Sequence, residues 1–291
     1  MKIVIIQHID ARNIHNLLAY IKISTKKWYP CNKGGEFQKW FGNEDYILNW
    51  KSDGYEIRNF KDETGALRSR PQNTQYFFKE GITWSTVTMG KPSFRFSSAG
   101  RIFESGGSTL FSIEEDIYFL LGVLNSKLGE LAVGILSPKV SLGEGAVAKF
   151  PIPKFDDEIK KSISKIAYTL VEDFKNMEFF NESSFHFKGL DLLNSSEIFI
   201  SDYSIRFQNF FNMKIEDIYE KERTIDDLIS KQPLQNEKNN SNDRDVNEFS
   251  DEVVGQKILS YAIGCMMGRY SLDEPGLIYA HAGNQDFDAS R

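Results

Sequence analysis

The spacing of apolar residues changes near Ser112, and this change limits the folds that the chain can adopt. Before Ser112, short segments rich in β-branched and aromatic residues alternate with glycine-containing turns, which is typical of strands. After it, apolar residues recur every three or four positions, which is typical of helices that bury one face. We therefore predict an α+β fold in which a β-rich domain precedes a mainly helical domain.

The predicted strands lie between residues 45 and 105. They are the segments DYILNW, YEIRNF, TQYFF, ITWSTVT, SFRFS and RIFES, which begin at residues 45, 55, 74, 82, 93 and 101. In SFRFS, alternation places Phe94 and Phe96 on one face of the strand and Arg95 on the other. The simplest expectation is a half-buried sheet with Arg95 in solvent.

The first predicted helix follows directly. Ser112 and Glu115 have the spacing of a capping box, and the apolar positions from Ile117 to Ile135 predict one helix that Pro138 ends. Two charged residues interrupt this apolar run, so we interpret it as a buried helix and not as a membrane span.

The rear of the chain is predicted to be helical. Asp156 or Asp157 is the expected cap of a helix with one apolar face, formed by Ile159, Ile163, Ile166, Leu170, Phe174 and Met177. Further helices are predicted over 201–211, 214–230 and 251–272, where Gly264 favours close packing. Residues 231–249 are polar and predict a loop. The expected organisation is a lead-in over 1–25, a recognition domain over 26–155 and a helical domain over 156–291.

Charge differs between the two parts. The segment from Lys26 to Arg101 contains 13 basic residues (Lys and Arg) and 8 acidic residues (Asp and Glu). From Ile102 onward the chain contains 19 basic and 32 acidic residues. A basic front and an acidic rear indicate two modules, although chance fluctuation with solvated faces explains the difference as well. The two cysteines, Cys31 and Cys265, form neither a disulfide framework nor a metal spacing, which favours a cytoplasmic location.

Several catalytic motifs are absent from the sequence. The segment KIVIIQH is not followed by a glycine-rich turn, and neither a P-loop nor Gly-x-Ser-x-Gly occurs. No two of the eight prolines are adjacent, which excludes the Asp/Asn-Pro-Pro-aromatic loop of enzymes that methylate base amines. The Glu158-x-Lys160 pattern of a metal nuclease lies at a predicted helix start, where acidic residues stabilise the helix dipole. We predict no catalytic, cofactor-binding or metal-binding residue in this chain.

What remains is a basic, aromatic, glycine-punctuated front. Lys26–Trp50 alone holds four lysines and seven aromatic rings. Lysine and arginine neutralise DNA phosphates, and arginine, asparagine and lysine also read base edges. Each such residue is on its own more often a plain surface cation, and most of the rings are expected in the core. Arg68 and Arg70, in an exposed loop, are the strongest candidates among the predicted DNA contacts: Lys33, Lys39, Arg58, Arg68, Arg70, Asn73, Arg95 and Arg101.

Three segments carry a resemblance to a known family. KWYPCNKGGEFQKWFGNEDYILNWKSDGYEIRNF, GITWSTVTMGKPSFRF with GSTLFS, and FLLGVLNSKLGELAVGILSPKVSLGEGAVAKFPIPK are similar to the target-recognition region of BREX-type, PglX-like adenine-specific DNA methyltransferases. The helix with LNSK also resembles TaqI-like specificity domains. The resemblance covers residues 26–155 well and 156–281 more loosely, and it identifies the chain as a C-terminal part whose catalytic domain lies upstream.

The resemblance implies sequence-specific recognition of double-stranded DNA for a phage-defence methyltransferase. The implied partners are DNA and a methyltransferase catalytic domain, in cis or in trans, with no membrane. S-adenosylmethionine is the implied cofactor of the parent enzyme, bound outside this chain. The alternative is a protein-interaction module, or an inactive truncated remnant of such an enzyme.

Overall fold

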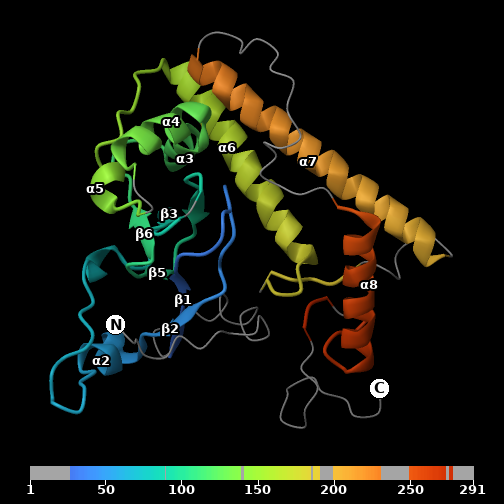
Figure 1. Ribbon diagram of the computed structural model, residues 1–291, viewed down its shortest axis with the longest axis horizontal. Coiled ribbons are helices and arrows are strands. Elements are labelled where there is room, and N and C mark those ends of the chain that lie inside the picture. The colour runs from blue at the N-terminus through green and yellow to red at the C-terminus, as the bar shows by residue number, and fades with distance from the viewer. Residues whose placement is uncertain are drawn as a thin grey trace.

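The structure is a computed structural model and describes residues 27–88, 90–138, 141–184, 186–190, 199–230, 249–272 and 275–277. It combines small sheets with long helices, which confirms the predicted α+β class (Figure 1). The predicted lead-in 1–25 and positions 231–248 of the predicted polar loop lie outside the described residues.

Two three-stranded sheets form the front. The first has the order β2-β1-β5 and contains β1 (Trp28–Asn32), β2 (Ile47–Asn49) and β5 (Ile102–Phe103). The second has the order β4-β3-β6 and contains β3 (Gly81–Ser85), β4 (Phe94–Ser97) and β6 (Gly107–Leu110). Strand β1 is antiparallel to β2 and parallel to β5, whereas β3 is antiparallel to both of its neighbours.

Four of the six predicted strand segments contain strands, and two predictions are wrong. YEIRNF lies mostly in helix α2 (Lys51–Arg58), which begins with three consecutive residues of positive φ, Ser52 to Gly54. TQYFF forms the 3-10 turn η2 (Thr74–Tyr76), between Asn73 and Phe78, which also have positive φ. Apolar alternation alone does not reveal such left-handed positions. Strands β1 and β6 lie outside the six predicted segments.

The apolar run predicted as one helix is two helices, α3 (Ile117–Asn125) and α4 (Lys127–Leu136), bent by 76°. The Asn125 amide bonds both the N–H and the C=O of Phe94, and Ser126 Oγ accepts the N–H of Gly129 as the cap of α4. Ser112 does accept the N–H of Glu115, but Asp116 caps the helix itself. Among the described residues no single helix is long and apolar enough to span a membrane. Only α3 and α4 taken together reach the required length and hydropathy, and they are bent relative to each other.

The remaining helices of the described residues are α5 (Glu144–Val147), α6 (Asp157–Met177), α7 (Ile200–Ser230) and α8 (Asp251–Met266), with the 3-10 turn η3 (Glu178–Phe180) after α6. The apolar face predicted for α6 is confirmed, because Ile163 and Leu170 are completely buried. The two helices predicted over 201–211 and 214–230 are one, α7, which lies along α6 (Figure 1).

One hydrophobic core joins the front to the rear. It contains Trp40 and Trp84 from the front, Leu121 from α3, and Leu170 and Ile225 from α6 and α7. The expected domain boundary at residue 155 therefore crosses a continuous core, and the division stays a prediction.

Gly264 is predicted to be essential for packing of α8. A Cβ atom at Gly264 would overlap the ring of Tyr270, which is buried, stacks on Tyr261 and donates a hydrogen bond to Glu182. We expect Gly264→Ala to lower the free energy of unfolding by about 1–3 kcal/mol, because the ring has little room to move. On the same helix, Gly255→Ala enters open space and is expected to stabilise the chain by up to about 1 kcal/mol. Urea denaturation measures both; equal effects of the two changes would contradict this packing.

Candidate nucleic-acid interface

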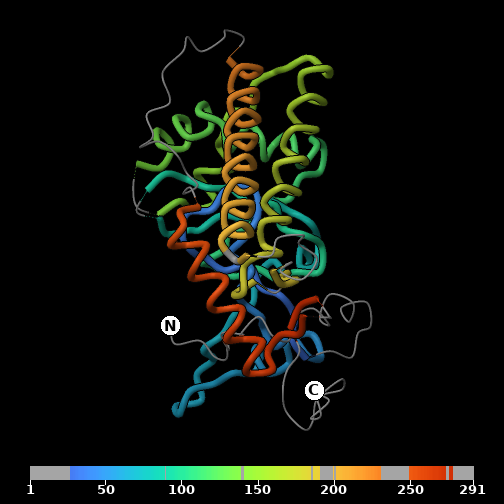
Figure 2. Tube along the Cα trace, turned by 90° about the vertical axis from the view of Figure 1, so that its right-hand side faces the viewer, coloured from blue at the N-terminus to red at the C-terminus, as the bar shows by residue number. Residues whose placement is uncertain are grey.

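Residues 50–79 form a lobe that extends from the first sheet, visible as the blue and light-blue segment around and after α2 (Figures 1 and 2). We call these residues the recognition lobe. A small hydrophobic cluster of Trp50, Ile57, Phe77 and Ile102 attaches it to β5, with Phe77 edge-on to Trp50 at 4.9 Å between centroids. The lobe is therefore anchored by packed rings and not by backbone pairing alone.

The start of the lobe is shaped by Gly54. Its φ is +73°, and an added Cβ atom would lie 2.6 Å from the Trp50 ring, so the chain turns tightly over the indole. This turn brings the Arg58 guanidinium over the same ring, 5.3 Å from its centroid, and Arg58 Nη2 lies 3.1 Å from the Asp53 carboxylate.

A short hairpin projects from the lobe. Lys61 and Leu67 form an antiparallel bridge, and Gly65 supplies the positive φ of the turn. The Asp62 carboxylate accepts bonds from the hydroxyl and N–H of Thr64 and from the N–H of Ala66, and Arg68 Nε lies 2.7 Å from it. These bonds, the Thr64 hydroxyl first, lower the pKa of Asp62. The hairpin is thus held by its own polar contacts.

Four of the eight predicted contacts lie within this lobe: Arg58, Arg68, Arg70 and Asn73. The Arg68 side chain is 62% exposed, and Arg70 and Asn73 are also exposed. Within the described ranges Arg70 forms no hydrogen bond or ion pair, so its guanidinium donors point to solvent. Arg58 is half-buried, so three of these four side chains are exposed on the lobe.

Lys33 and Lys39 lie outside the lobe and are half-buried. The Lys33 ammonium stands 4.4 Å from the centroid of the Tyr46 ring, and Lys39 Nζ lies 3.8 Å from Glu222 on α7. The neighbouring Trp40 also donates a hydrogen bond to Glu222, at 2.6 Å. Lys39 therefore helps to join the front to α7.

The expectation that Arg95 lies in solvent is wrong, and Arg101 is buried as well, with exposures of 1% and 4%. The Trp40 backbone pairs with β4 through bonds to Phe94 and Phe96, and the Arg95 guanidinium donates to the carbonyl of Gln38 and to the hydroxyl of Ser85. Burial, with Arg101 nearby, lowers the pKa of Arg95 to about 10. In this conformation both guanidinium groups are enclosed, and neither can touch a duplex.

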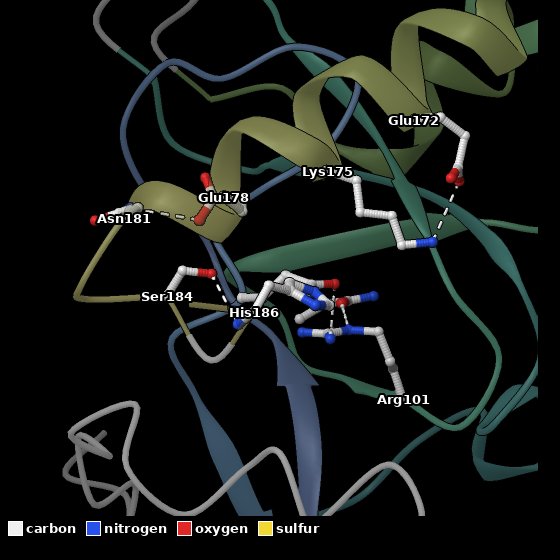
Figure 3. Close-up of polar contacts among 9 residues, drawn as sticks. Arg101, Glu172, Lys175, Glu178, Asn181, Ser184 and His186 are labelled. Atoms are coloured by element: carbon white, nitrogen blue, oxygen red, sulfur yellow. Dashed lines mark hydrogen bonds and ion pairs between the residues drawn. The ribbon is translucent and has the colours of Figure 1, made fainter. Parts of the chain in front are cut away.

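Arg101 belongs to a buried polar network centred on Glu44. One Glu44 oxygen lies 2.8 Å from Arg101 Nη1, and the other lies 2.9 Å from His186 Nε2 (Figure 3). Arg101 Nε also donates to Asn32 Oδ1 at 2.8 Å. His186 is 142 residues from Glu44 in the sequence and follows η3, so the network ties the front to the segment after α6.

A polar cavity of about 440 Å³ adjoins this network. Its walls come from the front segment that contains Gly34, Gln38 and Glu44, and from Glu178, Asn181, Ser183, Ser184 and His186 of the rear. Burial raises the pKa of the Glu178 carboxyl above its usual value, despite bonds from Ser184 and Asn181. Carboxylates line both sides of this cavity, Glu36, Glu44 and Asp45 in the front and Glu178 in the rear, and we assign the cavity to the joint between front and rear.

Sequence reasoning missed part of the lobe and all of the network. Leu67 and Tyr55 are 62% and 65% exposed, but an apolar pattern indicates burial and not exposure. The turn at Asp62–Gly65 was the available signal for a hairpin. For Glu44 and His186 the sequence holds no signal, because their contact depends on how α6 lies across the sheets.

The described residues do not suit a nucleotide-type cofactor. Such sites form at the carboxyl ends of parallel strands beside a helix N-terminus. In the described part, parallel pairing is limited to the two-residue register between β1 and β5 and to the single bridge between Trp40 and Arg95.

Comparison with known proteins relates the chain to two methyltransferases. The adenine-specific methyltransferase BrxX of Escherichia coli O9:H4 (strain HS) is 32% identical over 289 residues, which cover 90% of this chain. The adenine-specific methyltransferase PglX of Lacticaseibacillus casei (strain Zhang) is 32% identical over 278 residues, which cover 91%. The chain is PglX-related. No protein-family model matches it.

The PglX-related chain spans 22% of the length of each of these relatives. The predicted resemblance to PglX-like methyltransferases is thereby confirmed as sequence similarity over most of the chain. The aligned share takes in both the sheets and the helices, so the relationship is not confined to the recognition lobe.

Proposed function

We propose that this PglX-related chain recognises a duplex DNA sequence as the specificity portion of an adenine-specific DNA methyltransferase of a phage-defence, BREX-like system. The observation that carries the proposal is the recognition lobe, in which Arg58, Arg68, Arg70 and Asn73 share one projecting, internally braced segment. A braced segment loses little conformational entropy on binding.

The side chains of the lobe divide by role. Arg68 and Arg70 have donors suited to phosphate oxygens or to the O6 and N7 atoms of guanine. Asn73, at the start of η2, has the paired donor and acceptor that suits adenine. The Arg58 guanidinium lies over the Trp50 ring and would contact a phosphate at the edge of the lobe.

Catalysis is assigned to another part of the enzyme. S-adenosylmethionine and the methyl-transfer residues belong to a catalytic domain supplied in cis or in trans. The target adenine would leave the duplex toward that domain, while the recognition lobe holds the flanking base pairs.

A gel shift tests the proposal. The full chain is titrated into a pool of random-sequence duplexes at low and moderate salt, with and without the catalytic portion of a relative. We expect retention of duplexes by the chain alone, falling steeply with salt, and enrichment of one sequence on repeated selection. Absence of any retained duplex at low salt would contradict DNA recognition.

A second function, protein docking, is favoured by one observation. Leu259, Ile263 and Met266 lie on one face of α8 and are 62%, 47% and 87% exposed, while Val254, Ile258 and Tyr261 are buried on another. Apolar residues on two faces are typical of a helix with neighbours on both sides. Retention of the catalytic portion but not of DNA in the same experiment would favour docking.

A further inference from the structure

Leu67 is an apolar side chain placed among cations on a projecting hairpin. It is 62% exposed, precedes Arg68 in sequence and pairs across the hairpin with Lys61. It belongs to none of the three hydrophobic clusters of the described residues. The fold therefore does not depend on its burial.

The hairpin that carries Leu67 is braced without it. Asp62 bonds Thr64, Ala66 and Arg68, and the backbone N–H of Arg68 donates to the carbonyl of Phe60 at 2.9 Å. A single exposed leucine is common on protein surfaces and means little alone. Here it is presented by a rigid turn, beside two exposed arginines.

We propose that Leu67 is a wedge that enters between two adjacent base pairs and unstacks them; this rests on the proposed DNA recognition. DNA-bending proteins insert apolar wedges, leucine among them, between base steps and kink the duplex by roughly 20–90°. Arg68 and Arg70 hold the phosphates beside the opened step and offset the loss of stacking. The wedge selects deformable pyrimidine–purine steps, so Leu67 contributes to sequence preference without a hydrogen bond.

The proposal predicts a change in DNA shape more than in affinity. The probe is the duplex that the wild-type chain selects from the random pool, with dyes at both ends and 2-aminopurine at successive positions. We expect wild-type protein to shorten the end-to-end distance and to raise 2-aminopurine fluorescence at one step. Leu67→Ala is expected to abolish most of both signals while affinity falls only about three- to tenfold. Leu67→Met, which keeps an apolar wedge, is expected to restore both signals.

Leu131→Ala is the matched control, because Leu131 on α4 is 63% exposed and lies outside the lobe. It is expected to leave bending, fluorescence and affinity unchanged. If wild-type protein binds the duplex but neither bends nor unstacks it, or if Leu67→Ala bends it as wild type does, the wedge is overturned while DNA recognition stands. If wild-type protein retains no duplex at all, the proposed function fails first and the wedge with it.

Discussion

Replacing Arg68 and Arg70 together by alanine is expected to weaken DNA binding by roughly 10- to 100-fold at low salt. Both side chains are exposed in the recognition lobe. For each phosphate contact that is removed, DNA binding releases about one counterion fewer. The slope of log affinity against log salt should therefore fall in magnitude by about two for the pair. A gel-shift titration over several salt concentrations measures both quantities.

The matched control removes the same charge elsewhere. Lys161 and Lys165 are exposed on α6, outside the lobe, and their double alanine variant lowers the net charge equally. It is expected to change affinity by less than about threefold, through the long-range field alone. Equal losses from both double variants would mean that general charge, and not the lobe, binds DNA.

Replacing Glu44 by alanine is expected to lower the free energy of unfolding by about 3–5 kcal/mol. Glu44 is the carboxylate beside Arg101, whose side chain is 3% exposed, and Arg101 already has one buried nitrogen, Nη2, without a hydrogen-bond partner. Removal of Glu44 leaves a buried guanidinium with its charge uncompensated, and it also removes the bond to His186. Such a loss is a large share of the 5–15 kcal/mol of a typical domain, so urea denaturation should show an early or missing transition.

Glu172→Ala provides the comparison. Glu172 pairs with Lys175 three residues on, and both side chains are more than a third exposed. Water screens this pair, so the expected loss is about 0.5 kcal/mol or less. Similar losses for Glu44→Ala and Glu172→Ala would show that the buried network does not hold front and rear together.

Much of the helical fold could be predicted from spacing alone. The buried face of α6 was correctly assigned from Ile163 to Phe174, because a helix repeats its burial every three to four residues. The break at Ser126 was missed, since its cause is a contact of Asn125 with β4, far away in sequence. Helix α2 was mistaken for a strand because left-handed backbone at Ser52 and Asp53 leaves no trace in hydropathy.

The residues of the candidate interface were predicted from their residue types. The structure shows that some of these residues are exposed and others are buried. Arg95 and Arg68 look alike in sequence, as cations among apolar or turn residues. They differ in the structure because a second layer of chain covers β4, whereas the hairpin after α2 has solvent around it.

By itself the sequence determined the α+β class, the apolar faces of the helices and the kinship with PglX-like methyltransferases. These depend on local periodicity and on the identity of residues along the chain. Only the tertiary structure decided which cations reach solvent, that Glu44 meets Arg101 and His186, and that Leu67 stands exposed on a braced hairpin. Burial and charge pairing depend on which segments, distant in the sequence, pack against one another. The residues around any one position do not specify those distant partners.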